Sequence, residues 1–221
     1  MKRFAIIVAA GTGSRMESVV PKQFLLLKGK PILHYSIEAF FQHDPSTALF
    51  VVVSKEELKR WENLCVHYPV PSHQIVVGGE TRTQSVWNGL KLLPSEGLVA
   101  IHDGARPLVS SAIIEKCFQA ASLFGSGVAS IKSKDSLRLV LDSENQALDR
   151  EHVRLIQTPQ TFQNSFIKDA FDAYGTEASS DDATIAQRAG LNIQLVEGSY
   201  HNFKITTAED LIFAEAILSQ E

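Results

Sequence analysis

The sequence lacks the features of membrane, zinc-binding and nucleic-acid-binding proteins. Its longest apolar run, Phe4–Ala10, has seven residues, whereas a membrane-spanning helix needs about 20. The two cysteines, Cys65 and Cys117, form no C-x-x-C pair and indicate neither a disulfide framework nor a zinc site. Lysine and arginine total 21 against 25 acidic residues, which gives a net charge of −4. Because such a chain has no global basic field, we expect no nucleic-acid partner. Because its apolar runs are short, we also expect no membrane span.

Motifs of several enzyme and targeting classes are missing too. The sequence has no G-x-S-x-G and no H-E-x-x-H, so covalent hydrolase and zinc chemistry have no support. Residues Met1–Ala10 imitate a signal peptide, but no clean small-x-small cleavage site follows them. We therefore expect a cytoplasmic protein with reduced cysteines in its core. His102 lies between an apolar run and a loop, and we interpret it as a structural residue rather than a base.

What is present is the composition of a folded globular protein, with 44% hydrophobic and 21% charged residues in 221. Short apolar runs alternate with helical patterns, and runs without polar alternation are typical of strands buried in a parallel sheet. The order predicts an α/β sandwich with a mostly parallel central sheet. The predicted strands are Phe4–Val8, Leu49–Val53, Ile75–Val77, Leu98–Ile101, Val128–Ile131 and one near Ile193–Val196.

Helical spacing of apolar residues marks the segments between and after these strands. One helix is predicted after Ser54, where Glu57 has the spacing of a capping box, and another over Ala208–Leu218, where Thr207 and Asp210 have the same spacing. Further helices are predicted to begin near Thr83, to contain Ile113–Ala121, and to cover Phe166–Ala173 and Asp182–Ala189.

One segment, at about residues 132–157, interrupts the alternation of strands and helices. Leu137, Leu139 and Leu141 have period-two spacing before the polar stretch Asp142–Asn145, which is typical of strands around a turn. We predict an inserted β-arm here, within a single domain that spans residues 1–221. Because a two-stranded arm is marginal by itself in water, we expect the arm to mediate dimerisation.

The strongest local motif follows the first predicted strand, where Gly11-Thr-Gly13 opens a loop that contains Arg15 and Met16. A dinucleotide-binding loop needs glycine at position 16, and a P-loop needs glycine at 16 and lysine at 17, so both motifs fail. A glycine turn flanked by two cations, here Arg15 and Lys22, can still bind a polyphosphate. The alternative is an ordinary glycine turn with solvated basic residues.

Two more loops follow predicted strands at the edge where such sheets bind ligands. The segment Ile101–Pro107 contains Asp103 and Arg106, which suit metal-phosphate and anion contacts or, alternatively, form a structural ion pair. The segment Gly78–Arg82 leads into a helix whose first turn contains Ser85. Free N–H groups at this helix start can meet a base or ribose, although plain helix-start chemistry explains the same residues.

In chain order, these motifs resemble the 2-C-methyl-D-erythritol 4-phosphate cytidylyltransferases of the non-mevalonate isoprenoid pathway. The resemblance covers nearly the whole chain and implies a Rossmann-like nucleotidyltransferase sandwich. It rests on the ordered set, because sugar nucleotidyltransferases broadly share the first loop. The matching motifs are Gly11-x-Gly13-x-Arg15-Met16, Pro21-Lys22-Gln23, Gly78-Gly79 with Arg82 and Ser85, His102-Asp103-x-Ala105-Arg106-Pro107, Asp149-Arg150, Thr158-Pro159-Gln160 and Lys204.

The resemblance also implies roles for the matching residues. Arg15 and Lys22 would stabilise the transition state, and Arg150 and Lys204 would position a sugar phosphate. Further substrate-positioning residues would be Asp103, Arg106, Ser136 and Thr158. The nucleotide-binding residues would be Ala9, Ala10, Gly11, Gly13, Gly79, Glu80, Arg82, Ser85 and Asp103.

The implied activity is transfer of a cytidylyl group from CTP to the sugar-alcohol phosphate, with release of pyrophosphate. Mg²⁺ is the implied cofactor, bound mainly through the CTP phosphates, with no metal ligand assigned to the protein. The matching arms in the family exchange across a homodimer, so Arg150 would serve the neighbour's site.

Two alternatives stay open at this point. The ribitol 5-phosphate cytidylyltransferases share most of the loops, and Gly104 and Ser136 stand where the family often has alanine and threonine. A non-catalytic nucleotide-binding module would need the glycine loop but not both Arg15 and Lys22.

Arg15 allows a first test of the transition-state role. We expect Arg15→Lys to have reduced turnover, because one ammonium group cannot reproduce the forked donors of a guanidinium group. The measurement is pyrophosphate release by the purified, folded variant. Activity equal to that of the unmodified protein would show that Arg15 takes no part in the reaction.

Overall fold

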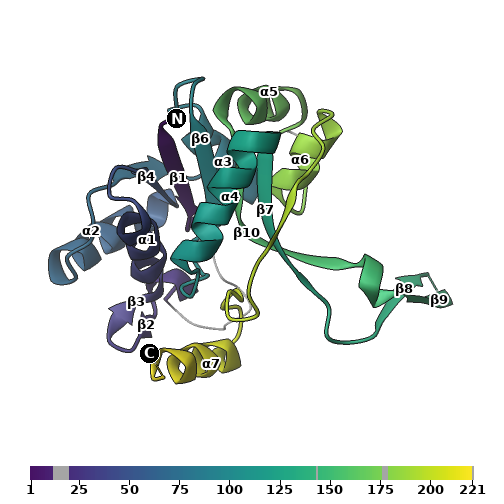
Figure 1. Ribbon diagram of the computed structural model, residues 1–221. Helices are drawn as coiled ribbons and strands as arrows, with labels where there is room; N and C mark the ends of the chain where they lie inside the picture. The colour runs from purple at the N-terminus through teal and green to yellow at the C-terminus, as the bar shows by residue number, and fades with distance from the viewer. Residues whose placement is uncertain (12–19, 143, 176–178, 221) are drawn as a thin grey trace.

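The computed structural model describes residues 1–11, 20–142, 144–175 and 179–220. Its centre is a seven-stranded sheet with the strand order β11-β7-β10-β6-β1-β4-β5. Figure 1 labels β1, β4, β6, β7 and β10 of this sheet. The strands are β1 (Arg3–Val8), β4 (Ala48–Val53), β5 (Gln74–Val77), β6 (Leu98–Asp103), β7 (Ser126–Lys132), β10 (Arg154–Gln163) and β11 (Leu195–Glu197).

The strand directions bring several loops to one edge of this sheet. Strand β1 pairs in parallel with β4 and β6, β4 pairs in parallel with β5, and β10 runs antiparallel to both of its neighbours. The predicted α/β class with a mostly parallel sheet is therefore confirmed. Because parallel strands end together, the loops after β1, β5 and β6 meet at their carboxyl ends.

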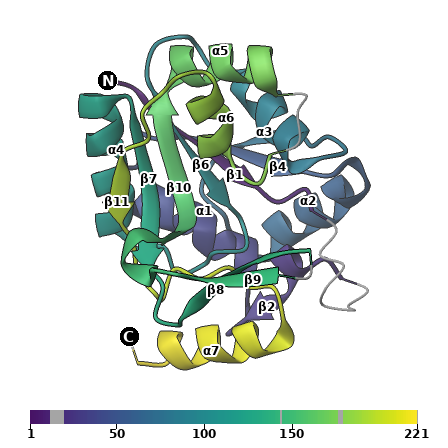
Figure 2. The ribbon, with the colours of Figure 1, turned by 90° about the vertical axis from the view of Figure 1, so that its right-hand side faces the viewer.

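Helices cover both faces of the sheet, as Figures 1 and 2 show. On one face, α1 (Ile32–His43), α2 (Leu58–His67) and α4 (Ser111–Phe124) contribute Phe40, Trp61 and Phe118 to a buried cluster. On the other face, α3 (Arg82–Leu90), α5 (Asn164–Tyr174) and α6 (Asp182–Arg188) contribute Leu90, Phe171 and Ile185 to a second cluster. Strands buried between two such layers explain the continuous apolar runs of the sequence.

A third, smaller cluster is formed by elements that lie below the sheet in Figure 1. It joins the short pair β2 (Leu26–Leu27) and β3 (Lys30–Pro31) to α7 (Ala208–Leu218) through Leu27, Ile32, Ile205 and Ala214. The predicted capping box of Thr207 and Asp210 is present at the start of α7. This helix anchors the chain just after residue 204.

The capping box predicted at Ser54 and Glu57 is wrong. Ser54 precedes a short 3-10 turn, η3 (Lys55–Glu57), and its side chain makes no capping hydrogen bond. The α-helix begins only at Leu58, because the chain passes through this tighter turn first.

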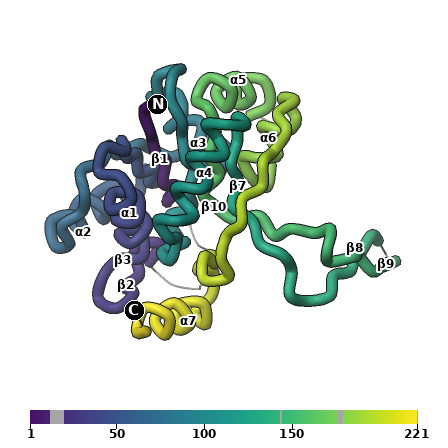
Figure 3. The backbone as a smooth tube through the Cα atoms, viewed as in Figure 1, coloured from purple at the N-terminus to yellow at the C-terminus, as the bar shows by residue number. Residues whose placement is uncertain are grey.

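The segment between β7 and β10 contains β8 (Leu137–Leu141) and β9 (Glu144–Leu148), which pair only with each other within the described chain. Figures 1 and 3 show this hairpin projecting from the body. Its apolar side chains are exposed: Val140 is 65% and Leu141 63% accessible. A short 3-10 turn, η4 (Arg150–His152), follows the hairpin.

The predicted end of this segment, at residue 157, needs correction. Arg154–Gln157 begins β10 of the central sheet: Arg154, Leu155 and Ile156 pair with β7, and the strand pairs with β6 as well from Gln160 onwards. The pairing of β10 with β7 shifts register between Ile156 and Gln160, around the cis peptide bond from Thr158 to Pro159. Because the pairing is irregular here, the ten residues of β10 do not show the period-two alternation by which a strand is recognised in a sequence.

Candidate active site

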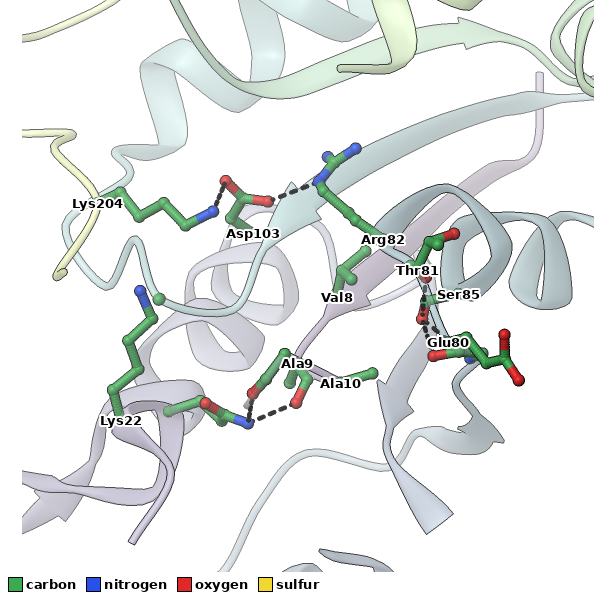
Figure 4. A pocket seen from close by; sticks show the side chains of 14 residues that line it. Val8, Ala9, Ala10, Lys22, Glu80, Thr81, Arg82, Ser85, Asp103 and Lys204 are labelled. Atoms are coloured by element: carbon green, nitrogen blue, oxygen red, sulfur yellow. Dashed lines mark hydrogen bonds and ion pairs between the residues drawn. The ribbon is translucent and has the colours of Figure 1, made fainter. Parts of the chain in front are cut away.

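A cavity of about 350 Å³ lies beyond the carboxyl ends of β1, β5 and β6. Figure 4 shows its labelled side chains arriving from separate segments of the chain, with Lys22 and Lys204 on one side and the start of α3 on the other. Its lining residues include Ala9, Ala10, Gly11, Lys22, Gly79, Glu80, Arg82, Ser85, Asp103 and Lys204. The structure thus brings together most of the residues that the sequence assigned to the nucleotide and to catalysis.

The loop after β1 and the turn that carries Lys22 are joined by Gln23. Its buried amide Nε2 donates hydrogen bonds to the carbonyl oxygens of Ala9, at 2.7 Å, and Gly11, at 3.0 Å. On the same 3-10 turn, η2 (Lys22–Phe24), Phe24 stacks on Trp61 in the core. Gln23 thus fixes Lys22 relative to the loop, a function that no sequence motif had indicated. Gly13 and Arg15 lie outside the described residues.

The start of α3 forms another wall. Thr81 caps the helix by accepting a hydrogen bond from the Gln84 N–H. The Ser85 hydroxyl accepts from the Gly79 N–H at 3.0 Å and donates to the Thr81 carbonyl at 2.9 Å. Ser85 is 1% exposed, so in this geometry it shapes the loop after β5. The positive end of the α3 dipole favours negative charge in this part of the cavity.

Gly78 allows the loops after β1 and β5 to approach each other closely. A Cβ atom at this position would lie 2.4 Å from the Cβ of Ala10 and 3.1 Å from the Ser85 hydroxyl. Any larger residue would force the two loops apart, so the absence of a side chain sets the width of the cavity here.

Asp103, at the end of β6, is surrounded by three cations. Its carboxylate lies 3.0 Å from Lys204 Nζ, 3.3 Å from Arg82 Nε and 3.5 Å from Arg106 Nε. Burial alone would raise the pKa of Asp103, but Arg82, Lys204 and Arg106 outweigh it and hold the pKa well below its usual range. Asp103 therefore stays ionised at every physiological pH and keeps the cations in place.

Arg82 is fixed further by Asp182, a residue that the sequence analysis did not single out. The guanidinium donates to both carboxylate oxygens of Asp182, at 2.9 and 2.8 Å, although the two residues are 100 positions apart. Burial alone would lower the pKa of Arg82, but the carboxylates of Asp182 and Asp103 raise it. Asp182 starts α6, so this forked ion pair ties α6 to α3 beside the cavity.

A second cavity, of about 310 Å³, adjoins this charged cluster. Arg82, Asp103 and Lys204 line both cavities. The other residues that line the second cavity include Arg106, Gln157, Thr158, Gln160, Ser180 and Asp181. The predicted residues Arg106 and Thr158 thus belong to this second space, and the cation cluster forms the border between the two.

Arg150 and Ser136 are placed differently from the other predicted residues. Neither is among the described residues that line the two cavities. The Arg150 guanidinium donates to the Lys134 carbonyl at 2.9 Å and its side chain is 51% exposed, while Ser136 is exposed just before β8.

His102 has no access to a substrate. It is completely buried, and burial lowers its pKa to about 4. The interpretation of His102 as a structural residue rather than a general base agrees with this position.

Comparison with known proteins agrees with this geometry. Residues 4–220 match the family described as IspD, 2-C-methyl-D-erythritol 4-phosphate cytidylyltransferase. The chain belongs to this family. A relative of that name from Bacteroides thetaiotaomicron is 38% identical over 219 residues, covering 99% of this chain and 100% of its own length. One from Bacteroides fragilis is 40% identical, with the same coverage of both chains.

Two solved structures are similar over nearly the whole chain. The 4-diphosphocytidyl-2C-methyl-D-erythritol synthase from Anaerococcus prevotii has a TM-score of 0.85 and 30% identity, covering 99% of this chain and 96% of that one. The 2-C-methyl-D-erythritol 4-phosphate cytidylyltransferase from Thermus thermophilus has a TM-score of 0.81 and 31% identity, covering 99% and 100%. The family resemblance of the motifs is therefore confirmed.

The local packing explains why Gly104 stands where the family often has alanine. A Cβ atom there would lie 2.7 Å from Leu33 Cδ1 and 3.2 Å from the Val8 carbonyl oxygen. Leu33 of α1 occupies the space that an alanine methyl group would need, so glycine fits this packing.

The bridge made by Gln23 predicts a loss of activity without a loss of fold. We expect Gln23→Met, which has similar volume but no donors, to lower kcat/KM for CTP by about 10- to 100-fold, because Lys22 and the loop lose their shared anchor. The exposed residue Gln119 provides the control Gln119→Met, which should keep full activity. Unchanged kinetics in a folded Gln23→Met protein would contradict the positioning role.

Proposed function

We propose that this protein transfers a cytidylyl group from CTP to 2-C-methyl-D-erythritol 4-phosphate, giving 4-diphosphocytidyl-2-C-methyl-D-erythritol and pyrophosphate. The observation that carries the proposal is the pair of adjoining cavities with a shared border of Arg82, Asp103 and Lys204. One cavity suits the nucleotide, since it has the loop after β1 and the start of α3. The other suits a second anionic substrate that must meet the first at the cations.

The chemistry needs charge compensation rather than a base. A phosphate monoester has a second pKa of about 6, so near pH 7 it is mostly a dianion and can attack the α-phosphorus of CTP directly. The barrier lies in bringing two anions together and in the extra negative charge of the transition state. We propose that Lys22 and Arg15 offset this charge, while Lys204 and Arg150 position the sugar phosphate.

Mg²⁺ is proposed to enter mainly on the phosphates of CTP. Within the described ranges, no three His, Cys, Asp or Glu side chains gather in the way that a protein-held metal would require. Of the two carboxylates that line the nucleotide cavity, Asp103 already contacts three cations and Glu80 is exposed. These two carboxylates fit a Mg²⁺ ion that enters the site bound to the nucleotide. On the CTP phosphates, the ion would neutralise part of the phosphate charge.

We also propose a homodimer in which the β8–β9 hairpin contacts the second copy. Exposed apolar residues on and beside the hairpin, such as Val140, Leu141 and Leu155, support this assignment because they would leave water on association. A cytoplasmic location is proposed from the two free cysteines. No helix among the described residues is long and apolar enough to span a bilayer.

The substrate assignment is tested by following pyrophosphate release with CTP, Mg²⁺ and each sugar phosphate in turn. Release with methylerythritol phosphate is the expected result, since the relatives described above are named for that substrate. Release with ribitol 5-phosphate alone would make that sugar the substrate. Release with neither would leave a nucleotide-binding module.

The variant Lys204→Ala tests the border between the two cavities. Because Lys204 is proposed to meet the incoming phosphate monoester, we expect its KM for methylerythritol phosphate to rise about tenfold or more. The Kd for CTP, measured by calorimetry with Mg²⁺, should stay nearly unchanged. Lys59→Ala, at an exposed lysine on α2, is the matched control. A selective loss of CTP binding would reassign Lys204 to the nucleotide.

The shared site is tested by mixing two inactive homodimers. Lys22→Ala should lower turnover by roughly 10²-fold, and Arg150→Ala should be similarly impaired. If Arg150 acts across the dimer, each mixed dimer has one site with both defects and one intact site. Random pairing then restores about a quarter of the unmodified activity.

The same mixture gives a clear negative outcome. If Arg150 serves its own subunit, every site keeps one defect and mixing restores nothing. Subunit exchange is confirmed independently with a mass tag. The control Arg138→Ala changes another exposed arginine of the hairpin, and it should remain active as a homodimer.

A further inference from the structure

His102 makes two side-chain hydrogen bonds beside the site although it lines neither cavity. Its ring lies between the sheet and α1, with the edge of Phe40 packed against it at 5.3 Å between ring centroids. One ring nitrogen, Nε2, lies 3.2 Å from the carbonyl oxygen of Arg106. The other, Nδ1, lies 3.0 Å from the hydroxyl of Thr158.

These partners determine where the proton of the neutral ring lies. A carbonyl oxygen only accepts hydrogen bonds, so Nε2 must carry the proton and donate to Arg106. Nδ1 is then the acceptor, and the Thr158 hydroxyl donates its proton to it. The Thr158 oxygen in turn accepts from the Asp103 N–H at 3.1 Å.

The hydrogen bonds therefore run in one direction, from the Asp103 N–H through Thr158 and His102 to the Arg106 carbonyl. They close a ring around the turn that carries Asp103 and Arg106, which also has a backbone bond from the Arg106 N–H to the Asp103 carbonyl at 3.0 Å. Ordered polar networks of this kind rigidify a buried region when every member is paired.

We propose that His102 is a positioning residue, which holds the Asp103–Arg106 turn and directs the Thr158 hydroxyl at the border of the second cavity. The proposal rests on the function proposed above, because the reaction gives this turn its purpose. His102 acts through Asp103, Arg106 and Thr158 and does not touch a substrate.

The direction of the hydroxyl has a chemical consequence. Thr158 lines the second cavity, but its proton is committed to His102. Because this hydroxyl also accepts from the Asp103 N–H, any further hydrogen bond that its oxygen makes to a substrate must be one that it accepts. A phosphate dianion has no proton to donate, whereas the hydroxyl groups of a sugar alcohol do. His102 thus makes Thr158 suitable for a sugar hydroxyl and unsuitable for the phosphate group.

Nitrogen NMR of histidine in the unmodified protein tests the network without any substrate. We expect the His102 ring to show the tautomer with the proton on Nε2, and to keep it across the range from about pH 6 to 8. The charged groups around it are Asp103, Arg106 and Lys204. The other tautomer, or a ring that titrates near neutral pH, would overturn the proposal.

Two substitutions separate the two hydrogen bonds. His102→Gln can keep a donor near Nε2 but loses the acceptor for Thr158. We expect its KM for methylerythritol phosphate to rise about tenfold, the usual effect of one lost hydrogen bond, with the KM for CTP within about twofold. His102→Asn places an oxygen near the position of Nδ1, so it should recover part of the affinity for the sugar phosphate.

A double-mutant cycle with Thr158→Val completes the test. Because both substitutions break the same chain, the double variant should be no worse than the more impaired single variant. Thr158→Ser, which keeps the hydroxyl, should recover most of what Thr158→Val loses. Additive effects, or equal losses in the KM values of both substrates, would show that His102 contributes only to folding.

A buried histidine elsewhere provides the control. His34→Gln changes a 3% exposed histidine on α1 that pairs with Glu38, and it should leave the KM for the sugar phosphate unchanged. If the proposed function is wrong, the unmodified protein will show no activity with CTP and methylerythritol phosphate. The NMR measurement tests the His102 hydrogen bonds whether or not the protein has this activity.

Discussion

The charge balance at Asp103 is the constraint on which the site depends. Three cations, Arg82, Arg106 and Lys204, come from three separate parts of the chain and would repel one another without the carboxylate between them. Asp103 is 7% exposed, so its interactions with these cations are little screened by water. The cations are thereby assembled before any anionic substrate arrives, which reduces the reorganisation that binding requires.

The direction of the strands explains why these residues meet. Asp103 ends β6 at the carboxyl edge of the parallel strands, and β10 passes alongside in the opposite direction. This antiparallel strand brings Thr158 to within hydrogen-bond distance of the Asp103 N–H. A strand parallel to β6 would end at this edge, whereas the antiparallel β10 enters the sheet here with Gln157 and Thr158, which line the second cavity.

Buried side-chain hydrogen bonds then fix the loops that the strands bring together. Gln23 ties the loop after β1 to the turn of Lys22, Ser85 closes the loop after β5, and Asp182 holds Arg82. Gln23 and Ser85 form hydrogen bonds with backbone groups, and Asp182 binds the charged guanidinium of Arg82. Such anchoring residues keep mobile lysine and arginine side chains within the small range of positions that phosphate chemistry requires.

Apolar periodicity and glycine-cation motifs are local patterns, and they were sufficient to predict the α/β class, most of the strands and the loops with chemical function. The same local patterns assigned Arg154–Gln157 to an arm and Ser54 to a capping box, and they gave no function to Gln23 or Asp182. Only the tertiary structure decided that β10 lies inside the sheet, that Asp182 meets Arg82 across 100 positions and that His102 is connected to Thr158. A local pattern specifies how a segment folds but not which distant segment becomes its partner, since that choice depends on the packing of the whole chain.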